Sequence, residues 1–248
     1  MKSIILAAGY ATRLYPLTLT TPKPLLAIQG TPILNYLLHD IDAIESISEH
    51  IIVTNHKFIG NFENWLSSQH FQHPVTLLDD KTTSNENRLG AVRDLWLAIS
   101  SLNLTDDLLV LAGDNLLDFS LKTFVSFFDH YQTPCVMCYC ENDPIKQKKT
   151  AIITKDAHDK ITSYEEKPAT PNGNLAVPPF YCYRNCDVLK ISEALTDGCS
   201  PDAPGSFAAW LNKQTTIHAF NMPGHRYDIG DIDSYQAAQN TIKLPKLN

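Results

Sequence analysis

The sequence lacks a long hydrophobic run and an excess of positive charge. A membrane-spanning helix needs about 18 or more consecutive apolar residues, and none of the 248 residues belongs to such a stretch. Near the N-terminus, Arg13 follows the apolar run Ile4–Ala8 too soon for a signal peptide. The formal net charge of −7 argues against a nucleic-acid-binding surface. A cytoplasmic protein without membrane or nucleic-acid partners is therefore expected.

The cysteines lack the spacing of a structural zinc site. Cys135, Cys138 and Cys140 lie close together, but no second CxxC pair accompanies them. Apolar residues interleave with the three, and free cysteine often behaves as a small core hydrophobe. The run from residue 134 to 140 is therefore predicted to be a buried strand that carries reduced thiols.

Short apolar runs alternate with helical patterns, and no internal repeat or linker interrupts them before residue 141. Strands are predicted at 3–6, 51–53, 75–78, 108–112 and 134–140, and helices at 33–44, 58–66, 89–99 and 121–130. Further on, strands are expected at 150–154, 160–164, 174–183 and 216–221, helices at 188–195, 206–211 and 235–241, and a charged loop at 141–149. This rhythm predicts the α/β class, with a mostly parallel mixed sheet and helices on both faces.

The first 27 residues combine a strand, a turn of small residues and two cations. The turn Ala8-Gly9-Tyr10-Ala11-Thr12-Arg13 follows the first strand, and its backbone N–H groups can form a cradle for an anion. Arg13 adds a planar fork for phosphate oxygens. Lys23 adds a point charge, and a proline on either side restricts its backbone. Together these features indicate a polyphosphate site.

A second motif, Ala112-Gly113-Asp114-Asn115, ends the most apolar strand. An aspartate at such a strand end is costly unless it meets a cation, and Mg²⁺ prefers one or two carboxylates together with phosphate oxygens. An Asx-turn or a helix N-cap explains these residues equally well when they are taken alone.

Two more polar segments have both a functional and an ordinary interpretation. The loop at 79–91 carries Asn85 and Asn87, whose amides could read a base edge or could simply belong to a solvated loop with a helix cap. Glu165-Glu166-Lys167-Pro168 follows a predicted strand, where such a charged run is usually a surface salt-bridge cluster.

In this order the motifs resemble the sugar-1-phosphate nucleotidyltransferases, the nucleoside-diphosphate-sugar pyrophosphorylases. Their fingerprint reads L-A-G/A-G-x-G-T-R-L/M-x-P-x-T and then P-K-P-L/M, and the chain departs from it where Ala11 replaces the usual second glycine. A G-D-N motif, an E-E-K-P motif and the run Asp228-Ile229-Gly230 complete the match. The resemblance implies a Rossmann-like three-layer sandwich, GT-A-like, over residues 1–240. Residues 1–140 would bind the nucleotide, 141–240 the sugar phosphate, and 241–248 would be a C-terminal tail.

The resemblance also implies a Mg²⁺-dependent transfer of a nucleotidyl group from a nucleoside triphosphate to a sugar 1-phosphate. Asp114 and Asp228 would hold Mg²⁺, and Arg13, Lys23 and Lys167 would contact the pyrophosphate, the α-phosphate and the attacking phosphate. The other residues expected to bind the nucleotide are Leu6, Ala7, Ala8, Gly9, Tyr10, Asn85, Asn87, Gly90 and Asn115. Those expected to bind the sugar phosphate are Glu166, Lys167 and Tyr181. Because relatives often form dimers or tetramers, the resemblance also allows a homo-oligomer.

Departures from the family pattern leave two alternatives. The usual glutamine of the base-reading loop is missing, and Pro178-Pro179 precede the aromatic pair Phe180-Tyr181. A cytidylyltransferase acting on phosphocholine, with an aromatic cage from Tyr181, Phe180 or Trp210, is the first alternative. A non-catalytic nucleotide-binding regulatory protein is the second, supported only by Ala11. If Ala11 has a positive φ, its strain is about 1–2 kcal/mol, which a rigid scaffold can carry.

Overall fold

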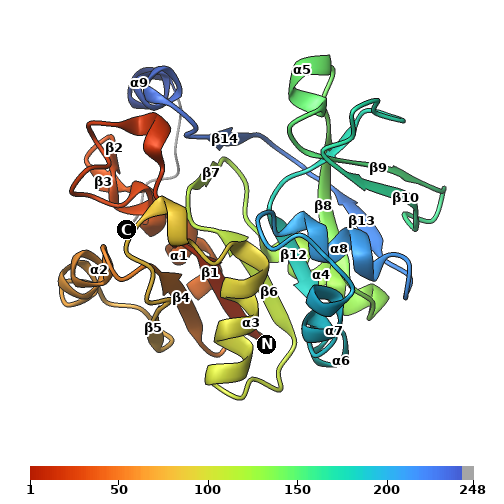
Figure 1. The fold of residues 1–248 in the computed structure, drawn as a ribbon, viewed down its shortest axis with the longest axis horizontal. Coiled ribbons are helices and arrows are strands. Elements are labelled where there is room, and N and C mark those ends of the chain that lie inside the picture. The colour runs from red at the N-terminus through yellow and green to blue at the C-terminus, as the bar shows by residue number, and fades with distance from the viewer. Residues whose placement is uncertain (242–248) are drawn as a thin grey trace. The chain divides into compact units, whose positions relative to one another are not determined.

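The computed structural model describes residues 1–241, which divide into two compact units (Figure 1). The first unit comprises Met1–Leu89, Ala112–Lys122 and the described part of Pro223–Asn248. The second comprises Gly90–Leu111 and Thr123–Met222. The chain therefore enters the first unit three times. This path brings the N-terminal turn, the G-D-N motif and the segment around Asp228 into one body.

Three parallel strands form the main sheet of the first unit. β1 (Lys2–Leu6), β4 (His50–Thr54) and β5 (Val75–Asp79) pair in that order. Helices α1 (Ile33–Asp42) and α2 (Ile59–Leu66) connect them, as the alternating pattern predicts. All five residues of β4 are buried, which fits a parallel strand that is covered on both faces.

Short strand pairs and one helix complete the first unit, and some of them come from its later segments in the sequence. β2 (Ala27–Ile28) pairs with β3 (Thr31–Pro32), and β7 (Asn115–Leu117) pairs with β14 (Arg226–Asp228). The last described helix, α9 (Ile232–Thr241), lies beside β2 in Figure 1. The β7–β14 ribbon was not predicted, and its register places Asp228 opposite Asn115.

The second unit has a mixed sheet in the strand order β10-β9-β11-β8-β12-β6. These strands are β6 (Leu108–Ala112), β8 (Cys135–Cys140), β9 (Ala151–Lys155), β10 (Ile161–Glu166), β11 (Leu175–Val177) and β12 (Phe180–Tyr183). β13 (His218–Asn221) pairs with β8 in parallel, whereas the pairs between neighbours along that strand order are antiparallel. The α/β class is confirmed, and the antiparallel pairs make this unit the mixed part of the fold.

Six helices are described in or at the border of the second unit. They are α3 (Ala91–Ser101), α4 (Lys122–Tyr131), α5 (Pro144–Gln147), α6 (Asn185–Val188), α7 (Ile191–Thr196) and α8 (Gly205–Leu211). Among residues 1–241, no helix has both the length and the apolar character needed to cross a membrane.

Three sequence-based expectations about secondary structure are wrong. The strand expected at 174–183 is two strands, β11 and β12, because Pro178 and Pro179 between them lack the N–H groups that a ladder needs. The helix expected at 188–195 is likewise divided into α6 and α7. The loop expected at 141–149 contains α5, which Asp143 caps by accepting a hydrogen bond from the Ile145 N–H at 2.8 Å. Residues 242–248 of the expected tail lie outside the described residues.

The cysteine-rich run is the buried strand that was expected. Cys135 and Cys138 are fully buried in β8, and all six cysteines are free. Burial raises the pKa of Cys135 to about 12 and that of Cys138 to about 11. These two thiols are therefore protonated at neutral pH and contribute to packing.

A buried histidine at the start of β4 couples stability to pH. His50 is fully buried, and its Nε2 lies 3.1 Å from Oδ1 of Asp42. Burial lowers the pKa of His50 below its ordinary value of 6.5. As the pH falls below about 6.5, the unfolded chain therefore binds a proton at this residue more readily than the folded chain does. Stability is lost as the pH falls below that value.

We predict a shallower acid dependence of stability for the His50→Gln variant. The free energy of unfolding of the unmodified chain should fall by up to about 1.4 kcal/mol per pH unit from this residue as the pH drops below about 6.5. Urea unfolding at several pH values, in the presence of a chelator, measures both slopes. Equal slopes for the variant and the unmodified chain would refute this role of His50.

Candidate active site

The turn that follows β1 lines a cavity of about 180 Å³ in the first unit. The Gly113 N–H donates to the Leu6 carbonyl at 3.0 Å and so fixes the G-D-N motif beside the end of β1. The cavity is lined by Leu6, Ala7, Gly9, Ala11, Arg13, Leu14, Lys23, Pro24, Ala112, Asp114 and Gly230. The structure thus brings together six residues that the sequence assigned to nucleotide binding or catalysis.

Ala11 adopts the left-handed backbone conformation that its place in the fingerprint requires. Its φ is 46° and its ψ is 45°, in the region that glycine occupies without strain. The Ala11 carbonyl accepts hydrogen bonds from the Leu14 N–H at 2.9 Å and the Thr18 hydroxyl at 2.8 Å. These bonds hold the turn into the short 3₁₀ helix Thr12–Leu14, which carries Arg13.

Because of this strain, we predict that the Ala11→Gly variant is more stable than the unmodified chain. Relief of the left-handed strain should raise the free energy of unfolding by about 1 kcal/mol, after allowance for the greater freedom of unfolded glycine. Urea unfolding provides the measurement. Ala8→Gly is the matched control and should lower stability, because Ala8 does not have a positive φ. A loss of stability in Ala11→Gly would contradict the strain.

Lys23 forms ion pairs with both aspartates that were predicted to hold Mg²⁺. It lies in the short helix Lys23–Leu25, and only 8% of the residue is exposed. Its Nζ is 2.7 Å from Oδ2 of Asp114 and 3.6 Å from Oδ1 of Asp228. One ammonium group therefore lies between two carboxylates that are 114 positions apart in the sequence.

The pKa of Asp114 reflects this arrangement. Desolvation by itself raises a carboxyl pKa, but here the charge and hydrogen bond of Lys23, together with the charge of Arg226, outweigh it. The pKa of Asp114 is lowered below its ordinary value, so the side chain is a carboxylate at neutral pH.

Arg226 is a site residue that the sequence reasoning missed. Its Nε donates to Oδ1 of Asn115 at 2.5 Å, and its Nη2 lies 3.1 Å from Oδ2 of Asp228. The Asn115 amide in turn donates to Oδ1 of Asp114 at 2.8 Å. Arg226 lies two residues before Asp228 in the sequence, and this proximity was the available signal. Its guanidinium orients Asp228 directly and Asp114 through Asn115.

The donor set suits a hard divalent cation. Asp114 lines the cavity, and Asp228 lies near Lys23, which also lines it. The side chains of the two aspartates are 34% and 52% exposed. Mg²⁺ is held by one or two carboxylates and completes its shell with water and phosphate oxygens. The two acids are balanced by Lys23 and Arg226, so a cation and a phosphate group can enter together without a large net charge.

Arg13 and Asp231 lie next to Gly230. Arg13 is exposed, and its guanidinium nitrogens lie close to Gly230, within 4 Å of the place where a side chain at that position would begin. Asp231 accepts a hydrogen bond from the Ser234 N–H at 2.9 Å and so caps the start of α9. The glycine between them leaves Arg13 room to approach a ligand.

Of the two expected base-reading side chains, that of Asn87 is occupied by local contacts. Oδ1 of Asn87 accepts hydrogen bonds from the N–H groups of Thr83 and Ser84, at 3.2 and 3.0 Å. The Asn85 carbonyl accepts from Arg88 at 2.9 Å. This geometry favours a loop-capping role for Asn87 over a contact to a base.

The other expected nucleotide-binding residues have backbone or packing roles. The Ala8 carbonyl accepts from the Asn55 amide at 2.9 Å, and the buried Tyr10 hydroxyl lies 3.0 Å from Oγ1 of Thr82. Gly90 belongs to the second unit, has a φ of 92° and lies against the Pro201 carbonyl, so a larger residue would be both strained and crowded there. Contacts of these residues to a nucleotide stay predictions.

The residues expected to bind the sugar phosphate lie in the second unit. Glu166 ends β10, and burial raises its pKa. Lys167 follows with a φ of 49°, and its N–H donates to the Thr150 carbonyl at 3.2 Å. Tyr181 is buried in β12 and stacks on Tyr183, with 5.8 Å between ring centroids. Their role toward a sugar phosphate stays a prediction.

The aromatic cage of the first alternative is not assembled. Phe180 and Tyr181 are neighbours in β12, so their side chains point to opposite faces of the sheet. Trp210 stacks on Phe207 and donates to Asp197 at 3.1 Å. Phe180 and Tyr181 therefore do not contribute to one cage together, and a contribution from any one of the three rings stays a prediction.

Comparisons with known proteins place the chain in a family. The model of the family described as Nucleotidyl transferase matches residues 2–244. The chain belongs to the nucleotidyl transferase family. The family assignment agrees with the resemblance seen in the sequence motifs.

Relatives of this nucleotidyl transferase family member carry names of related activities. A Sulfolobus acidocaldarius protein with the provisional name mannose-1-phosphate guanyltransferase is 28% identical, over 99% of this chain and 65% of its own length. The bifunctional protein GlmU of Methanococcus aeolicus is 27% identical, over 93% of this chain and 51% of its own. Glucose-1-phosphate thymidylyltransferase of Mycolicibacterium smegmatis is 29% identical, over 100% and 84%. The chain thus spans about two thirds of the length of the Sulfolobus acidocaldarius protein and about one half of the length of GlmU.

Solved structures confirm the predicted fold class. A Bacillus anthracis protein crystallised with sucrose, provisionally described as a glucose-1-phosphate thymidylyltransferase, has a TM-score of 0.83 at 25% identity, covering 99% of this chain and 98% of that one. A UDP-glucose pyrophosphorylase complexed with UDP-glucose has a TM-score of 0.78 at 24% identity, over 96% and 97%. The nucleotidyltransferase fold therefore extends over nearly the whole chain.

Proposed function

We propose that this chain transfers a nucleotidyl group from a nucleoside triphosphate to a sugar 1-phosphate and releases pyrophosphate. The observation that carries the proposal is Lys23, whose ammonium lies between Asp114 and Asp228 beside the small-residue turn. This arrangement places a phosphate cradle, a cation and one metal-type ligand in one cavity, with a second such ligand near the cation. The names of the relatives point to the same reaction class.

In the proposed reaction, a phosphate oxygen of the sugar 1-phosphate attacks the α-phosphorus in line, and the bond to pyrophosphate breaks. Such transfers depend on positioning and on neutralisation of charge. Lys23 would neutralise the α-phosphate, Arg13 would hold the pyrophosphate, and Lys167 would orient the attacking phosphate. A general base is not needed, because a phosphate monoester is already ionised at neutral pH.

Asp114 and Asp228 would hold Mg²⁺, which when bound supplies further neutralisation of the phosphate charge. Lys23 has to share or give up its contacts with the two carboxylates when the cation binds. Arg226 keeps Asp228 in place during this exchange, because it contacts Oδ2 whereas Lys23 lies near Oδ1.

We therefore predict that Arg226→Gln lowers kcat by about tenfold and lowers the Mg²⁺ concentration needed for half-maximal activity. The first effect follows from the loss of a charge-assisted bond that orients Asp228, and the second from the removal of a competing positive charge. Steady-state rates across a Mg²⁺ series measure both. An Arg226→Lys variant keeps the positive charge but lacks the planar guanidinium with its several N–H donors. It should show only the loss in kcat. Unchanged Mg²⁺ dependence in Arg226→Gln would contradict this role.

The substrates are tested by a pyrophosphate-release assay with Mg²⁺. Each of the four ribonucleoside triphosphates and dTTP is combined with glucose 1-phosphate, mannose 1-phosphate, N-acetylglucosamine 1-phosphate and phosphocholine. Release with one sugar-phosphate pair supports the proposal and names the substrates. Release with phosphocholine alone would replace it with the cytidylyltransferase alternative. Silence across the panel, with nucleotide binding intact, would favour the regulatory alternative.

A further inference from the structure

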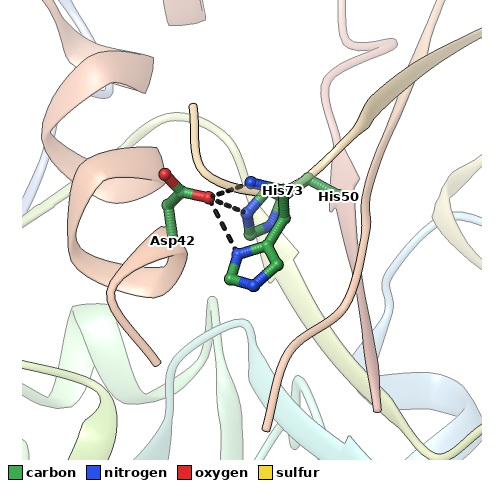
Figure 2. Close-up of side chains that lie close together, drawn as sticks. All are labelled: Asp42, His50 and His73. Atoms are coloured by element: carbon green, nitrogen blue, oxygen red, sulfur yellow. Dashed lines mark hydrogen bonds and ion pairs between the residues drawn. The ribbon is translucent and has the colours of Figure 1, made fainter. Parts of the chain in front are cut away.

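A second cluster of metal-type ligands lies in the first unit and has no part in the proposed reaction. Asp42 is the last residue of α1, His50 is the first residue of β4, and His73 lies two residues before β5. Figure 2 shows three dashed lines that converge on one carboxylate oxygen of Asp42. They come from Nε2 of His50 at 3.1 Å, from Nδ1 of His73 at 3.0 Å and from the His73 backbone N–H at 3.0 Å.

We propose that Asp42, His50 and His73 form a binding site for a zinc-type divalent cation. Two imidazoles and one carboxylate form a ligand set that Zn²⁺ accepts, and a solvent molecule can take the fourth position. The proposal does not depend on the transferase activity. It concerns a site of its own, built from α1, β4 and the segment before β5.

The spacing of the three ligand atoms is close to that of a tetrahedral site. Bonds of about 2.0–2.1 Å to each ligand would place the ligand atoms roughly 3.3–3.5 Å apart. The carboxylate oxygen already lies 3.0 and 3.1 Å from the two ring nitrogens, and all three atoms lie within 4.8 Å of one another. Two of the three separations are therefore a few tenths of an ångström shorter than a bound ion would require, and the proposal needs the side chains to move apart by that amount.

The surroundings provide the outer hydrogen bonds that orient metal ligands. The Ser3 hydroxyl lies 2.7 Å from Nδ1 of His50. The Gln72 N–H donates to the second oxygen of Asp42 at 2.6 Å. With an ion on Nε2 of His50, Nδ1 would carry the ring proton and donate it to the Ser3 hydroxyl oxygen, so the ring would keep this partner. Such outer contacts fix ring orientation and ligand basicity in metal sites.

Burial and charge favour a cation at this place. Asp42 is 4% exposed, and in the part of the chain that the structure describes it forms no ion pair with lysine or arginine. Its oxygens accept hydrogen bonds from backbone N–H groups and face the two imidazoles, and a bound cation would add a full positive charge beside them. The His73 side chain is 24% exposed and leaves a path for the ion.

The test uses Co²⁺ as a spectroscopic probe of the complete chain, after treatment with a chelator and in excess Mg²⁺. Mg²⁺ occupies the oxygen ligands Asp114 and Asp228, whereas a site with two histidines prefers the transition metal. One equivalent of Co²⁺ should give the visible absorption of a four-coordinate ion, and Zn²⁺ should abolish it. Zn²⁺ should also raise the Tm.

The variants identify the ligands. His73→Gln should weaken Zn²⁺ binding at least about a hundredfold in equilibrium dialysis, abolish the Co²⁺ spectrum and remove the rise in Tm. His70→Gln is the matched control, because His70 is an exposed histidine in the same segment, and it should behave like the unmodified chain. His73 is partly exposed, so its variant should remain folded, and its Tm without metal checks this. Absence of the spectrum in the unmodified chain, or an equal spectrum in His73→Gln, would overturn the proposal and leave a hydrogen-bonded cluster.

Discussion

Replacement of Asp114 by asparagine is expected to lower kcat by at least about a thousandfold, because the variant loses one of two carboxylates that would hold Mg²⁺. Asparagine keeps the shape of the side chain and one oxygen toward Lys23, which is 2.7 Å away in the unmodified chain. The fold should therefore persist. Rates in the pyrophosphate-release assay, taken with the best substrate pair across a Mg²⁺ series, measure the loss.

Asp118→Asn is the matched control for Asp114→Asn. Asp118 lies four residues further along the same segment, but its carboxylate accepts hydrogen bonds from the His225 backbone and lies 2.9 Å from the His225 ring. Its replacement should leave kcat within about twofold of the unmodified value. Near-normal turnover by a folded Asp114→Asn variant would exclude Asp114 as the metal ligand.

The second large effect is expected for Lys23→Met, which should lower kcat by about a hundred- to a thousandfold. Methionine keeps most of the buried stem but removes the charge that would face the α-phosphate. It also removes the group that lies between Asp114 and Asp228, so the two carboxylates should bind Mg²⁺ more tightly. The Mg²⁺ concentration for half-maximal activity should therefore fall, whereas in Asp114→Asn it should rise.

This opposite change in Mg²⁺ dependence separates the two roles. Thermal unfolding adds a readout that does not need turnover, because Mg²⁺ should raise the Tm of Lys23→Met more than that of the unmodified chain. Lys122→Met, at an exposed lysine at the start of α4, should change neither quantity. Normal kcat in Lys23→Met, or a raised Mg²⁺ requirement, would contradict the assigned position of the ammonium group.

The sequence predicted the cavity because its residues lie in short, dense motifs. A strand followed by a small-residue turn, and an aspartate at the end of an apolar strand, are local patterns with local physical causes. The strained Ala11 is an example, since its φ of 46° follows from its place in the turn. The same holds for the Asp231 cap, which depends on a residue only three positions away.

Other features depend on contacts between distant residues. The β7–β14 ribbon brings Arg226 to Asn115 across 111 positions, and no periodicity in either segment indicates that pairing. The cluster of Asp42, His50 and His73 could likewise not be predicted from the sequence, because the three residues come from separate segments of the chain. The break in the strand expected at 174–183 could have been predicted from the sequence, because two consecutive prolines cannot continue a strand that pairs with a strand on each side. The signal was in the sequence there, and the apolar run around it concealed it.

The most direct test of the central claim is a phosphorus NMR spectrum of one reaction mixture. It contains Mg²⁺, the chain, and the triphosphate and sugar 1-phosphate that respond in the release assay. The proposed transfer predicts that a nucleotide-sugar diphosphate and pyrophosphate appear in equal amounts while both substrates decline together. Formation of pyrophosphate with a nucleoside monophosphate, and with the sugar 1-phosphate unchanged, would show hydrolysis and contradict the proposed function.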